Sequence, residues 1–542
     1  MIVVVILDMK YTYLCVTMMS VFAGCSVGMA LGESVPSPYV ASPSGERLTP
    51  AVEAKPAING PLVVGAVVNK PFLFRIPVSG QKPINLQVTG LPEGVKFDAK
   101  NGVISGIVRK SQDFPLKIVA KNQAGSDEQT IELKVGDQIS LTPPMGWNSW
   151  YCHSELISQD AVLETARQMV ESGLADFGWS YVNIDDCWQG ERGGPSLALQ
   201  ANARFGDMKK MCDDVHELGL RVGIYSTPWV STYAGFRGGS SMNEKGDDSA
   251  LGLPEDKRLQ ATQIFGRWPG LSQLKLDKTG DYWFFDRDAQ QWADWGFDYV
   301  KVDWKPNDVP TTERIYKDLK KTDRAIILSL SNAAPFENMK GLIQYANATR
   351  TTGDIHDAWS SIKGIGFSQE KWQQFLKPGH WPDPDMLQVG KLGKPNNMNT
   401  KFEPTHLSPD EQYTQVSLWA LLSAPLLLSC DLSDMDDFTK GLLCNDAVIK
   451  VNQDAQASPA KKVLDCDGFQ IWTKELSDGS MAMGIFNLND GKKTLKLDTD
   501  ILGLAGRNKV TDLWKQKGLG TIVNGWEVEV NPHGVVLLKI AK

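Results

Sequence analysis

Apolar and polar residues follow two different rhythms along the chain, and the change of rhythm divides the chain into regions. Between residues 141 and 454, short apolar runs alternate with stretches in which apolar residues recur every three or four positions. Short apolar runs predict buried strands, and the longer recurrence predicts helices. Eight strand–helix units in succession are typical of a (β/α)8 barrel. We therefore predict an α/β fold with a TIM barrel over residues 141–454.

The predicted elements of the barrel are short and evenly spaced. The eight predicted strands are Met145–Trp150, Tyr181–Asp185, Arg221–Ser226, Tyr299–Asp303, Ala325–Ser329, Ala346–Thr352, Met386–Val389 and Pro425–Ser429. The predicted helices are Ser158–Ser172, Asp207–Leu218, Asp288–Trp295, Glu313–Lys320, Gln369–Leu376 and Asp410–Leu422. The segment Phe236–Tyr282 fits neither rhythm. Long loops are uncommon unless functional, and this one follows a strand, so we expect the insertion 236–282 over the face where the strands end.

Alternation with a period of two dominates on both sides of the barrel. Between residues 61 and 140, runs such as Leu116–Ala120 are separated by turn residues at the spacing of a small β-sandwich. The turns around Leu91–Gly94 and Asn101–Gly106 resemble those of bacterial immunoglobulin-like modules. Residues 455–542 return to strand patterns and predict a C-terminal antiparallel β-sandwich.

The first 60 residues differ from the rest of the chain. Residues 1–30 predict an export signal, with an apolar stretch that is too short to be a membrane span. Small residues before Cys25 fit a lipoprotein cleavage box with a lipid anchor on Cys25, and ordinary cleavage near Ala30 is the alternative. Residues 31–60, rich in Pro, Ser, Ala and Glu, predict a linker. We therefore expect export from a bacterial cell, to the periplasm, to the outer membrane as a lipoprotein, or to the medium.

Composition and charge exclude several classes of function. Hydrophobic residues make up 42% and charged residues 22% of the chain, which suits a globular protein. The formal net charge is −8 and no Lys/Arg block occurs, so no nucleic-acid partner is expected. The sequence has no C-x-x-C pair, no metal-spaced His pair and no nucleotide-binding loop, so we expect neither a metal nor a cofactor. Fourteen of the 17 Trp lie between Trp147 and Trp419, which suggests an aromatic-lined pocket in the barrel.

Polar residues collect where the predicted barrel strands end. The second strand runs into Asp185-Asp186, the fourth carries Lys301 and Asp303, and the sixth is followed by Arg350-Thr-Thr-Gly-Asp354. Lys301 and Asp303 are two positions apart on one strand, so both side chains point into the mouth of the barrel. Barrel enzymes place their catalytic groups at these strand ends. Several acids with few cations and nearby Trp rings suit a sugar better than a phosphate.

Four motifs occur in the order of a known family. They are Met145-Gly-Trp-Asn-Ser-Trp150, Asp185-Asp-Cys-Trp188, Lys301-Val-Asp303 and Asp383-Pro-Asp-Met-Leu387. With them the chain resembles the glycoside hydrolase family 27 α-galactosidases, also called melibiases. The resemblance covers most of the barrel, from Pro144 to Asp454, and resumes loosely in the C-terminal sandwich.

The resemblance implies a retaining exo-hydrolase that removes terminal, non-reducing α-D-galactosyl residues from oligo- or polysaccharides by double displacement. Asp303 would be the nucleophile and Asp354 the acid/base. Retention requires the two carboxyl groups to lie only ~5–5.5 Å apart. These roles imply that Asp303 is ionised beside the Lys301 cation, and that Asp354 is held protonated in a drier setting.

The resemblance also implies a set of sugar-binding residues. Asp185 and Asp186 would accept hydrogen bonds from the 4- and 6-hydroxyls, Lys301 and Arg350 would contact the 2-, 3- and 4-hydroxyls, and Trp150 would line the floor of the pocket. Tyr225 lies where the family has a pocket aromatic residue, and Ser331 lies near the 2-position of the sugar. A Cys152–Cys187 disulfide is implied as well, with two free thiols as the alternative.

Departures from the family pattern leave alternatives open. Trp304-Lys305 follows Asp303 where the family has a disulfide cysteine, and the insertion 236–282 replaces the loop of its partner, so the leaving-group sites are expected to differ. Ser331 and Ala334 match the α-N-acetylgalactosaminidases of the family. β-L-Arabinopyranosidase is another alternative, and a non-catalytic sugar-binding protein is a remote one. We interpret the immunoglobulin-like module as a spacer, with a carbohydrate-binding role as the alternative.

Overall fold

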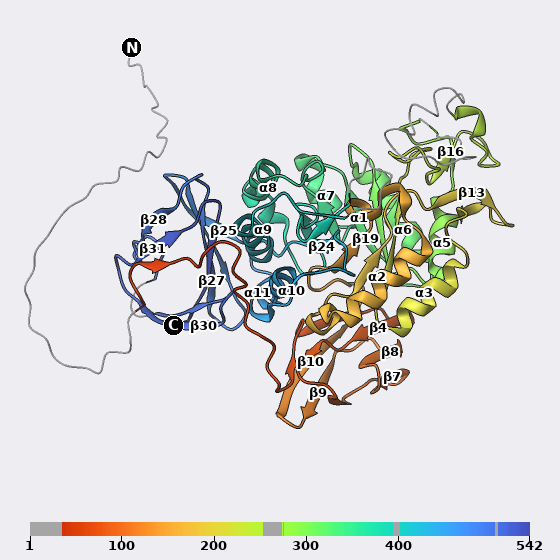
Figure 1. The fold of residues 1–542 in the computed structure, drawn as a ribbon. Coiled ribbons are helices and arrows are strands. Elements are labelled where there is room, and N and C mark those ends of the chain that lie inside the picture. The colour runs from red at the N-terminus through yellow and green to blue at the C-terminus, as the bar shows by residue number, and fades with distance from the viewer. Residues whose placement is uncertain (1–34, 253–273, 275, 394–401, 505–507, 542) are drawn as a thin grey trace, which may run out of the picture.

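A computed structural model describes residues 35–252, 274, 276–393, 402–504 and 508–541. The predicted signal, residues 1–30 with Cys25, lies outside the described residues. Figure 1 shows a β-sandwich (orange) beneath a central barrel, and a second sandwich (blue) beside it. Within the described ranges, no helix combines the length and the apolar character that a membrane crossing needs.

The central body is a barrel of eight parallel strands, as the rhythm of the sequence predicts. In chain order the strands are β11 (Met145–Asn148), β12 (Tyr181–Asn183), β15 (Arg221–Ser226), β18 (Tyr299–Asp303), β19 (Ile327–Ser331), β20 (Ala348–Arg350), β21 (Trp381–Asp383) and β24 (Leu426–Leu428). They pair in the order β21-β20-β19-β18-β15-β12-β11-β24. A parallel bridge between Leu387 and Leu428 joins the two ends of this order. The predicted α/β class and TIM-barrel architecture are confirmed.

The position predicted for the seventh strand is wrong. This strand is Trp381–Asp383 rather than Met386–Val389. Asp385 has a φ of 86°, in the left-handed region, and it interrupts the strand before Leu387 pairs with Leu428 in the bridge that closes the barrel. The run Met386–Val389 is nevertheless fully buried. Its apolar character therefore reflects burial at the closure of the barrel, which periodicity cannot distinguish from strand pairing.

Helices cover the outside of the barrel (Figure 1). The longer ones are α2 (Gln159–Glu171), α3 (Met208–Glu217), α5 (Phe285–Trp295), α6 (Val309–Lys321) and α9 (Pro409–Leu421), and the shorter ones are α1 (Trp150–His153), α7 (Met339–Leu342), α8 (Trp359–Gly366), α10 (Asp437–Leu443) and α11 (Asp446–Asn452). The helix predicted at Gln369–Leu376 is a 3-10 helix, Gln369–Phe375. Helix α9 starts at a capping box of Ser408 and Glu411 and is buried along most of its length, because the C-terminal sandwich packs on it.

Short two-stranded antiparallel sheets lie within the loops of the barrel. They are β13 (Gln189–Gly193) with β14 (Ala198–Ala201), β16 (Ser240–Ser241) with β17 (Tyr282–Trp283), and β22 (Lys391–Leu392) with β23 (Glu403–Pro404). Strands β16 and β17 stand near the start and just past the end of the predicted insertion 236–282, so their pairing holds its two ends together. Figure 1 shows β16 at the end of the barrel opposite the orange sandwich, which agrees with the predicted face.

The predicted immunoglobulin-like module is a sandwich of two sheets, with strand orders β3-β10-β9-β6 and β4-β8-β7. The strands are β3 (Val63–Ala66), β4 (Pro71–Arg75), β6 (Asn85–Thr89), β7 (Val95–Asp98), β8 (Val103–Ile107), β9 (Phe114–Asn122) and β10 (Gly125–Val135), and a short pair, β2 (Ala57–Ile58) and β5 (Val78–Ser79), lies at the edge. Ile104, Leu116 and Ile118 are fully buried in its own apolar core. Alternate strand positions therefore fill this core, as the period-two pattern predicts.

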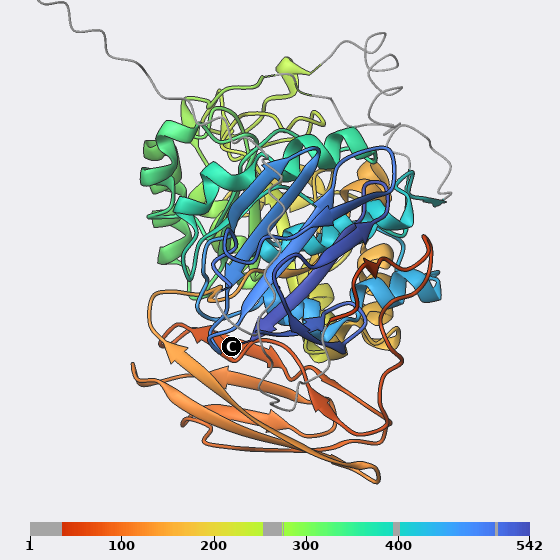
Figure 2. The ribbon, with the colours of Figure 1, turned by 90° about the vertical axis from the view of Figure 1, so that its left-hand side faces the viewer.

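The C-terminal domain is also a sandwich. Its larger sheet has the order β25-β26-β27-β32-β29-β30, with β25 (Lys461–Cys466), β26 (Phe469–Glu475), β27 (Met481–Asn487), β29 (Asn508–Asp512), β30 (Lys517–Ile522) and β32 (Val535–Ala541). Its smaller sheet is β1-β31-β28, with β1 (Tyr39–Val40), β28 (Lys493–Lys496) and β31 (Glu527–Val530). Figure 2 shows the larger sheet in blue, above the orange module.

The predicted linker, residues 31–60, is not a free tether over its described part. Strand β1 pairs in parallel with β31, Trp526 donates its indole N–H to the carbonyl of Pro36 at 2.6 Å, and Tyr39 donates its hydroxyl to Asp512. A Pro/Ser-rich composition predicts extended backbone, and extended backbone also suits an edge strand. Composition alone could not distinguish these two outcomes.

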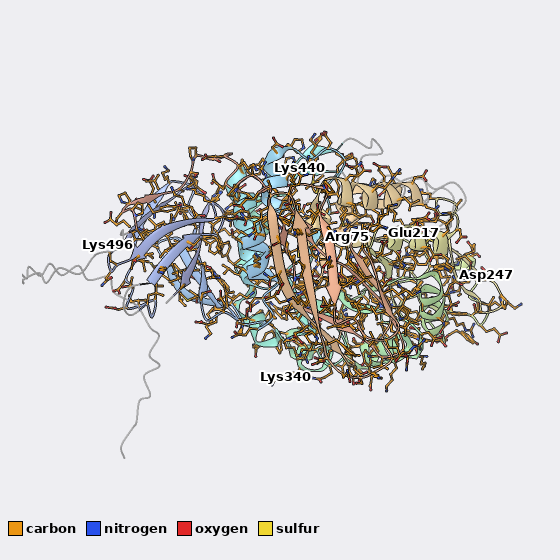
Figure 3. The ribbon with its side chains drawn as sticks, turned by 90° about the horizontal axis from the view of Figure 1, so that it is seen from below. Arg75, Glu217, Asp247, Lys340, Lys440 and Lys496 are labelled. Atoms are coloured by element: carbon orange, nitrogen blue, oxygen red, sulfur yellow. The ribbon has the colours of Figure 1, made fainter. Side chains whose placement is uncertain are left out.

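The immunoglobulin-like module is docked on the barrel at the end opposite the strand termini that carry the acids. Lys70 donates to three carbonyls at the C-terminal end of α6 and just beyond it, those of Lys320, Thr322 and Arg324, at 3.3, 2.7 and 3.2 Å. Arg75 donates to the carbonyl of Leu218 at 2.8 Å, and Figure 3 shows it beside the end of α3. The module was predicted to be a spacer. In the structure it contacts the barrel, and its Lys70 and Arg75 cations lie at the C-terminal ends of α6 and α3, where the helix dipole favours positive charge.

Replacing Lys70 with Met should lower the apparent melting temperature of the barrel by roughly 2–4 °C, because three carbonyls at the end of α6 lose a charged donor. Differential scanning calorimetry measures this change. Lys134→Met is the matched control, since Lys134 is exposed on the same module and pairs there with the exposed Asp113. Equal melting temperatures for wild type and Lys70→Met would contradict a stabilising contact between the module and the barrel.

Candidate active site

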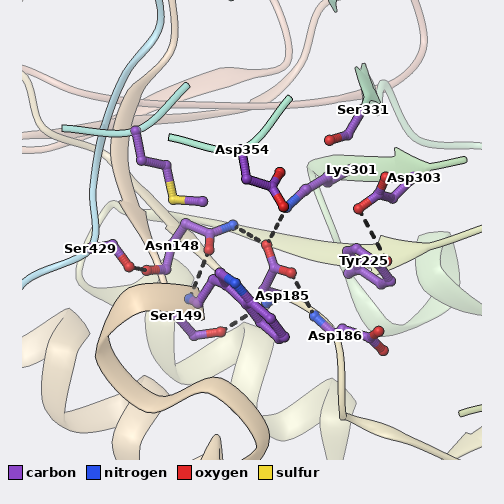
Figure 4. A network of polar contacts seen from close by, with 12 residues as sticks. Asn148, Ser149, Asp185, Asp186, Tyr225, Lys301, Asp303, Ser331, Asp354 and Ser429 are labelled. Atoms are coloured by element: carbon purple, nitrogen blue, oxygen red, sulfur yellow. Dashed lines mark hydrogen bonds and ion pairs between the residues drawn. The ribbon is translucent and has the colours of Figure 1, made fainter. Parts of the chain in front are cut away.

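The predicted site residues come together at the C-terminal ends of the barrel strands. Figure 4 shows Asp185, Tyr225, Lys301, Asp303 and Asp354 around one small space. Asp185 and Asp186 follow β12, Tyr225 lies in β15, Lys301 and Asp303 lie in β18, Ser331 ends β19 and Arg350 ends β20. Parallel strands bring their carboxyl ends to one edge, which explains why residues distant in sequence meet here.

A buried ion pair lies at the centre of this space. Lys301 donates from Nζ to Asp185 Oδ2 at 2.8 Å, and Asn148 donates from Nδ2 to the same oxygen at 2.8 Å. The backbone N–H of Asp185 donates to Ser149 Oγ at 2.9 Å. Burial lowers the pKa of Lys301, but Asp185 and Asp303 outweigh burial and raise this pKa above its ordinary value. Lys301 is therefore a permanent cation in the site.

Asp186 is buried beside this pair. Its Oδ1 accepts from the backbone N–H of Cys187 at 2.7 Å, and its Oδ2 accepts from that of Ala234 at 3.1 Å. Burial raises the pKa of Asp186 to about 6, against the hydrogen bonds that it accepts from Thr232 and from these N–H groups. The two backbone donors fix the carboxyl group in one orientation toward the site.

Asp303 has Tyr225 as its hydrogen-bond partner in the described part of the chain. Tyr225 donates its hydroxyl to Asp303 Oδ2 at 3.2 Å, while the buried Oδ1 has no hydrogen-bond partner among the described residues. Burial raises the pKa of Asp303 to about 7; Lys301 opposes this rise and the Asp354 carboxylate adds to it. One oxygen is thus held by Tyr225 and the other is available to a ligand.

Arg350 connects the other carboxyl groups. Its Nη2 lies 2.8 Å from Asp385 Oδ2 and 3.1 Å from Asp354 Oδ1, and its Nη1 lies 3.5 Å from Ser331 Oγ. The Asp354 side chain is 54% exposed. Partial burial raises the pKa of Asp354, but Arg350 and Lys301 outweigh it and hold this pKa below its ordinary value.

For the ligand-free site, the expected order of the pKa values of Asp303 and Asp354 is wrong. Asp303 was expected to be ionised and Asp354 protonated, yet the pKa of Asp303 is raised and that of Asp354 is lowered. The cause is geometric: Asp303 is almost completely buried, whereas Asp354 is half-exposed and paired with Arg350. A single proton shared by the two groups therefore resides on Asp303 when no ligand is bound.

Sequence reasoning missed two residues that organise the site. Asn148 holds Asp185 as described above, and it also accepts the backbone N–H of Trp150 at 2.9 Å, which fixes the half-buried Trp150 at the start of α1. Asp385 forms a buried ion pair with Arg350 and accepts the backbone N–H of Ile355 at 2.9 Å. Both residues belong to motifs quoted for the family, so the motifs themselves were the available signal.

The implied Cys152–Cys187 disulfide is not formed. Both thiols are free and buried, and burial raises the pKa of each well above its ordinary value. Cys152 lies near Cys430 instead, while Cys187 lies near Asp186. In the part of the chain that the structure describes, no group of three or more His, Cys, Asp or Glu side chains is placed to hold a metal ion.

Comparison with protein-family models identifies three matches. Residues 142–251 and 275–454 match the family described as "Alpha galactosidase A". Residues 466–540 match the "Alpha galactosidase C-terminal beta sandwich domain", and residues 55–136 match the "Putative Ig domain". The gap in the first match, residues 252–274, falls inside the predicted insertion 236–282, so only that middle part of the insertion is additional to the family pattern.

Individual relatives agree with these matches. A "Probable alpha-galactosidase" from Dictyostelium discoideum is 32% identical over 74% of this chain and 93% of its own length. The structure of a "putative alpha-galactosidase/melibiase" from Bacteroides fragilis is 29% identical with a TM-score of 0.77, covering 92% of this chain and 100% of that one. A β-L-arabinopyranosidase from Geobacillus stearothermophilus is 27% identical with a TM-score of 0.59, covering 74% and 97%.

Proposed function

The chain belongs to the α-galactosidase family of glycoside hydrolases, family 27, and on this basis we propose that it removes terminal, non-reducing α-D-galactosyl residues from oligo- or polysaccharides with retention of configuration. The observation that carries the proposal is the pair of carboxyl groups, Asp303 and Asp354, on either side of the Lys301 cation (Figure 4). Retaining glycosidases need two such carboxyl groups in a short span.

In this proposal Asp303 is the nucleophile. Tyr225 restrains Oδ2, so Oδ1, which has no partner among the described residues, is the atom that attacks the anomeric carbon. The new bond forms between Oδ1 and the sugar as the glycosidic bond breaks, and Asp354 gives its proton to the leaving oxygen. Water then attacks the same carbon, Asp354 takes the proton of that water, and Asp303 leaves.

The shared proton must change place before the first step. A bound substrate covers the exposed face of Asp354, and the loss of water raises the pKa of that carboxyl group. The proton then moves from Asp303 to Asp354 with no change in the total charge of the site. The substrate thereby produces an ionised nucleophile and a protonated acid together.

Sugar recognition is assigned to the groups that surround the catalytic pair. Asp185 and Asp186 accept hydrogen bonds from the 4- and 6-hydroxyls, and Lys301 donates to the 3- and 4-hydroxyls. Arg350 faces the 2- and 3-hydroxyls, while Trp150 and Tyr225 line the pocket. Support comes from the hydrogen bonds that already fix Asp185 and Asp186, because fixed acceptors discriminate strongly against a substrate that lacks the matching hydroxyl.

A second candidate, α-N-acetylgalactosaminidase activity, is favoured by one observation. Ser331 and Ala334 are small and buried, and both contact Arg350: Ser331 through its hydroxyl, and Ala334 through a 3.0 Å backbone hydrogen bond. Small side chains beside the group assigned to the 2-hydroxyl leave room for an acetamido substituent. The substrate comparison below distinguishes the two candidates.

Purified protein should show its highest kcat/KM on nitrophenyl α-galactoside, compared with the α-N-acetylgalactosaminide and the β-L-arabinopyranoside, because the fixed acceptors match every hydroxyl of galactose. Asp303→Asn should lower kcat/KM about a thousandfold or more. Asp434→Asn is the matched control, since Asp434 is exposed and pairs with Lys391 on the surface.

A preference for the acetamido substrate would establish the second candidate instead. Absence of turnover on all three glycosides would refute the proposed hydrolase. The anomer formed first, followed by NMR, tests the stereochemistry: α-galactose is expected, and β-galactose would exclude the double displacement.

The pH dependence follows from the shared proton. The pair holds one proton below about pH 7, where Asp303 titrates, and loses it above, so kcat/KM on a disaccharide should fall as pH rises through about 7. Tyr225→Phe removes a hydrogen bond to ionised Asp303, which raises the pKa of Asp303 and should move this alkaline limb to higher pH. If the alkaline decrease of kcat/KM stays at the same pH in Tyr225→Phe, or moves to lower pH, the ionisation of Asp303 does not cause it.

We also propose that the chain is exported and attached to a membrane by a lipid on Cys25. Small residues before Cys25 and the preceding apolar stretch support this location. In cells that express the full chain, Cys25→Ala should release galactosidase activity from the membrane fraction into the soluble fraction. Soluble activity in both wild type and variant would favour ordinary cleavage near Ala30.

A further inference from the structure

Tyr233 is a polar residue of the site that the mechanism above does not use. It lies in the loop that follows β15, and its ring is half-buried and packs edge-on against Trp229, with 5.4 Å between ring centroids. Its hydroxyl oxygen is buried and has no hydrogen-bond partner among the described residues. Buried hydroxyl groups are normally paired, so an unpaired one at an active site points to a ligand.

The surroundings of Tyr233 are acidic. Burial raises the pKa of Tyr233 above its ordinary value, and the carboxylates of Asp303, Asp277 and Asp354 raise it further. The phenol therefore stays neutral at every pH at which the enzyme would work, and its O–H remains a donor. The next residue, Ala234, is hydrogen-bonded to Asp186, so this donor lies on a loop that lines the sugar pocket.

The backbone around Tyr233 connects the sugar pocket to the rim. Its neighbour Ala234 donates its N–H to Asp186 at 3.1 Å, and the carbonyl of Gly235 accepts the N–H of Leu274 at 2.8 Å. Ser231 Oγ accepts the N–H of Leu276 at 2.9 Å and lies 3.4 Å from Asp277 Oδ1.

Tyr233 therefore lies between two different regions. The buried Asp186 is on one side of its loop, and the exposed Asp277, where the chain returns from the insertion, is on the other. The loop thus runs from the sugar pocket to the exposed surface. Since the galactosyl unit is assigned to the side of Asp186, we expect the leaving group on the side of Asp277.

We propose that Tyr233 binds the leaving group: its hydroxyl donates a hydrogen bond to an oxygen of the sugar unit that carries the cleaved galactosyl residue. This inference rests on the proposed function. The galactosyl hydroxyls already have the partners assigned above, whereas Asp354, one of the carboxyl groups that act on Tyr233, protonates the oxygen of the leaving group. The enzyme thus selects substrates whose leaving group is a sugar rather than an aryl or alkyl group.

The test compares Tyr233→Phe with wild type on melibiose, whose leaving group is glucose, and on nitrophenyl α-galactoside, whose leaving group has no hydroxyl at that place. The variant should lose roughly tenfold in kcat/KM on melibiose and less than about twofold on the aryl substrate. Inhibition by free galactose should not change. The melting temperature should stay equal or rise, because an unpaired buried hydroxyl is removed.

Tyr345→Phe is the matched control, since Tyr345 is also half-buried but lies before β20, at the opposite end of the barrel. Equal losses on both substrates, or weaker inhibition by galactose, would place Tyr233 on the galactosyl unit and overturn the proposal. Unchanged kcat/KM on melibiose would overturn it as well. A wild-type protein inactive on both substrates would refute the proposed function itself, and this inference with it.

Discussion

The site depends on the confinement of more carboxyl groups than cations in one buried space. The described residues of the site include Asp185, Asp186, Asp303, Asp354, Asp383 and Asp385, with Lys301 and Arg350 as their cations. So many charges of one sign cannot all be ionised together out of water. Burial accordingly raises the pKa of Asp186 and of Asp383 to about 6, and that of Asp303 to about 7. Protons are therefore a structural component of this site, and their positions can respond to a ligand.

The rest of the fold supplies the rigidity that such a cluster requires. The carboxyl groups lie at the ends of barrel strands or in the segments that directly follow them, and backbone N–H groups orient Asp186 and Asp385. The two sandwiches contact other surfaces: one lies at the opposite end of the barrel through Lys70 and Arg75, and the other packs on α9. Neither of these contacts involves the loops at the acidic end of the barrel.

The barrel and the members of the site could be predicted because their signals are local. Buried strands are apolar runs, and Lys301-Val-Asp303 places two side chains on one face by spacing alone. The seventh strand could not be located, because Met386–Val389 is as buried as a strand although Asp385 separates it from the regular strand Trp381–Asp383. The relative pKa values of Asp303 and Asp354 could not be predicted from the sequence either. They depend on how much water reaches each group and on the Arg350 contact, which only the folded arrangement determines.

The pairing of β1 with β31 has a consequence for the synthesis of the chain. The contact between Pro36 and Trp526 spans 490 positions, so one edge of the smaller C-terminal sheet is supplied by almost the first described residues. A ribosome delivers β31 near the end of synthesis, and until then β1 has no strand to join. The sandwich can therefore close only after the barrel between these two strands has been made, and a chain that lacks β1 would leave the edge of β31 unpaired.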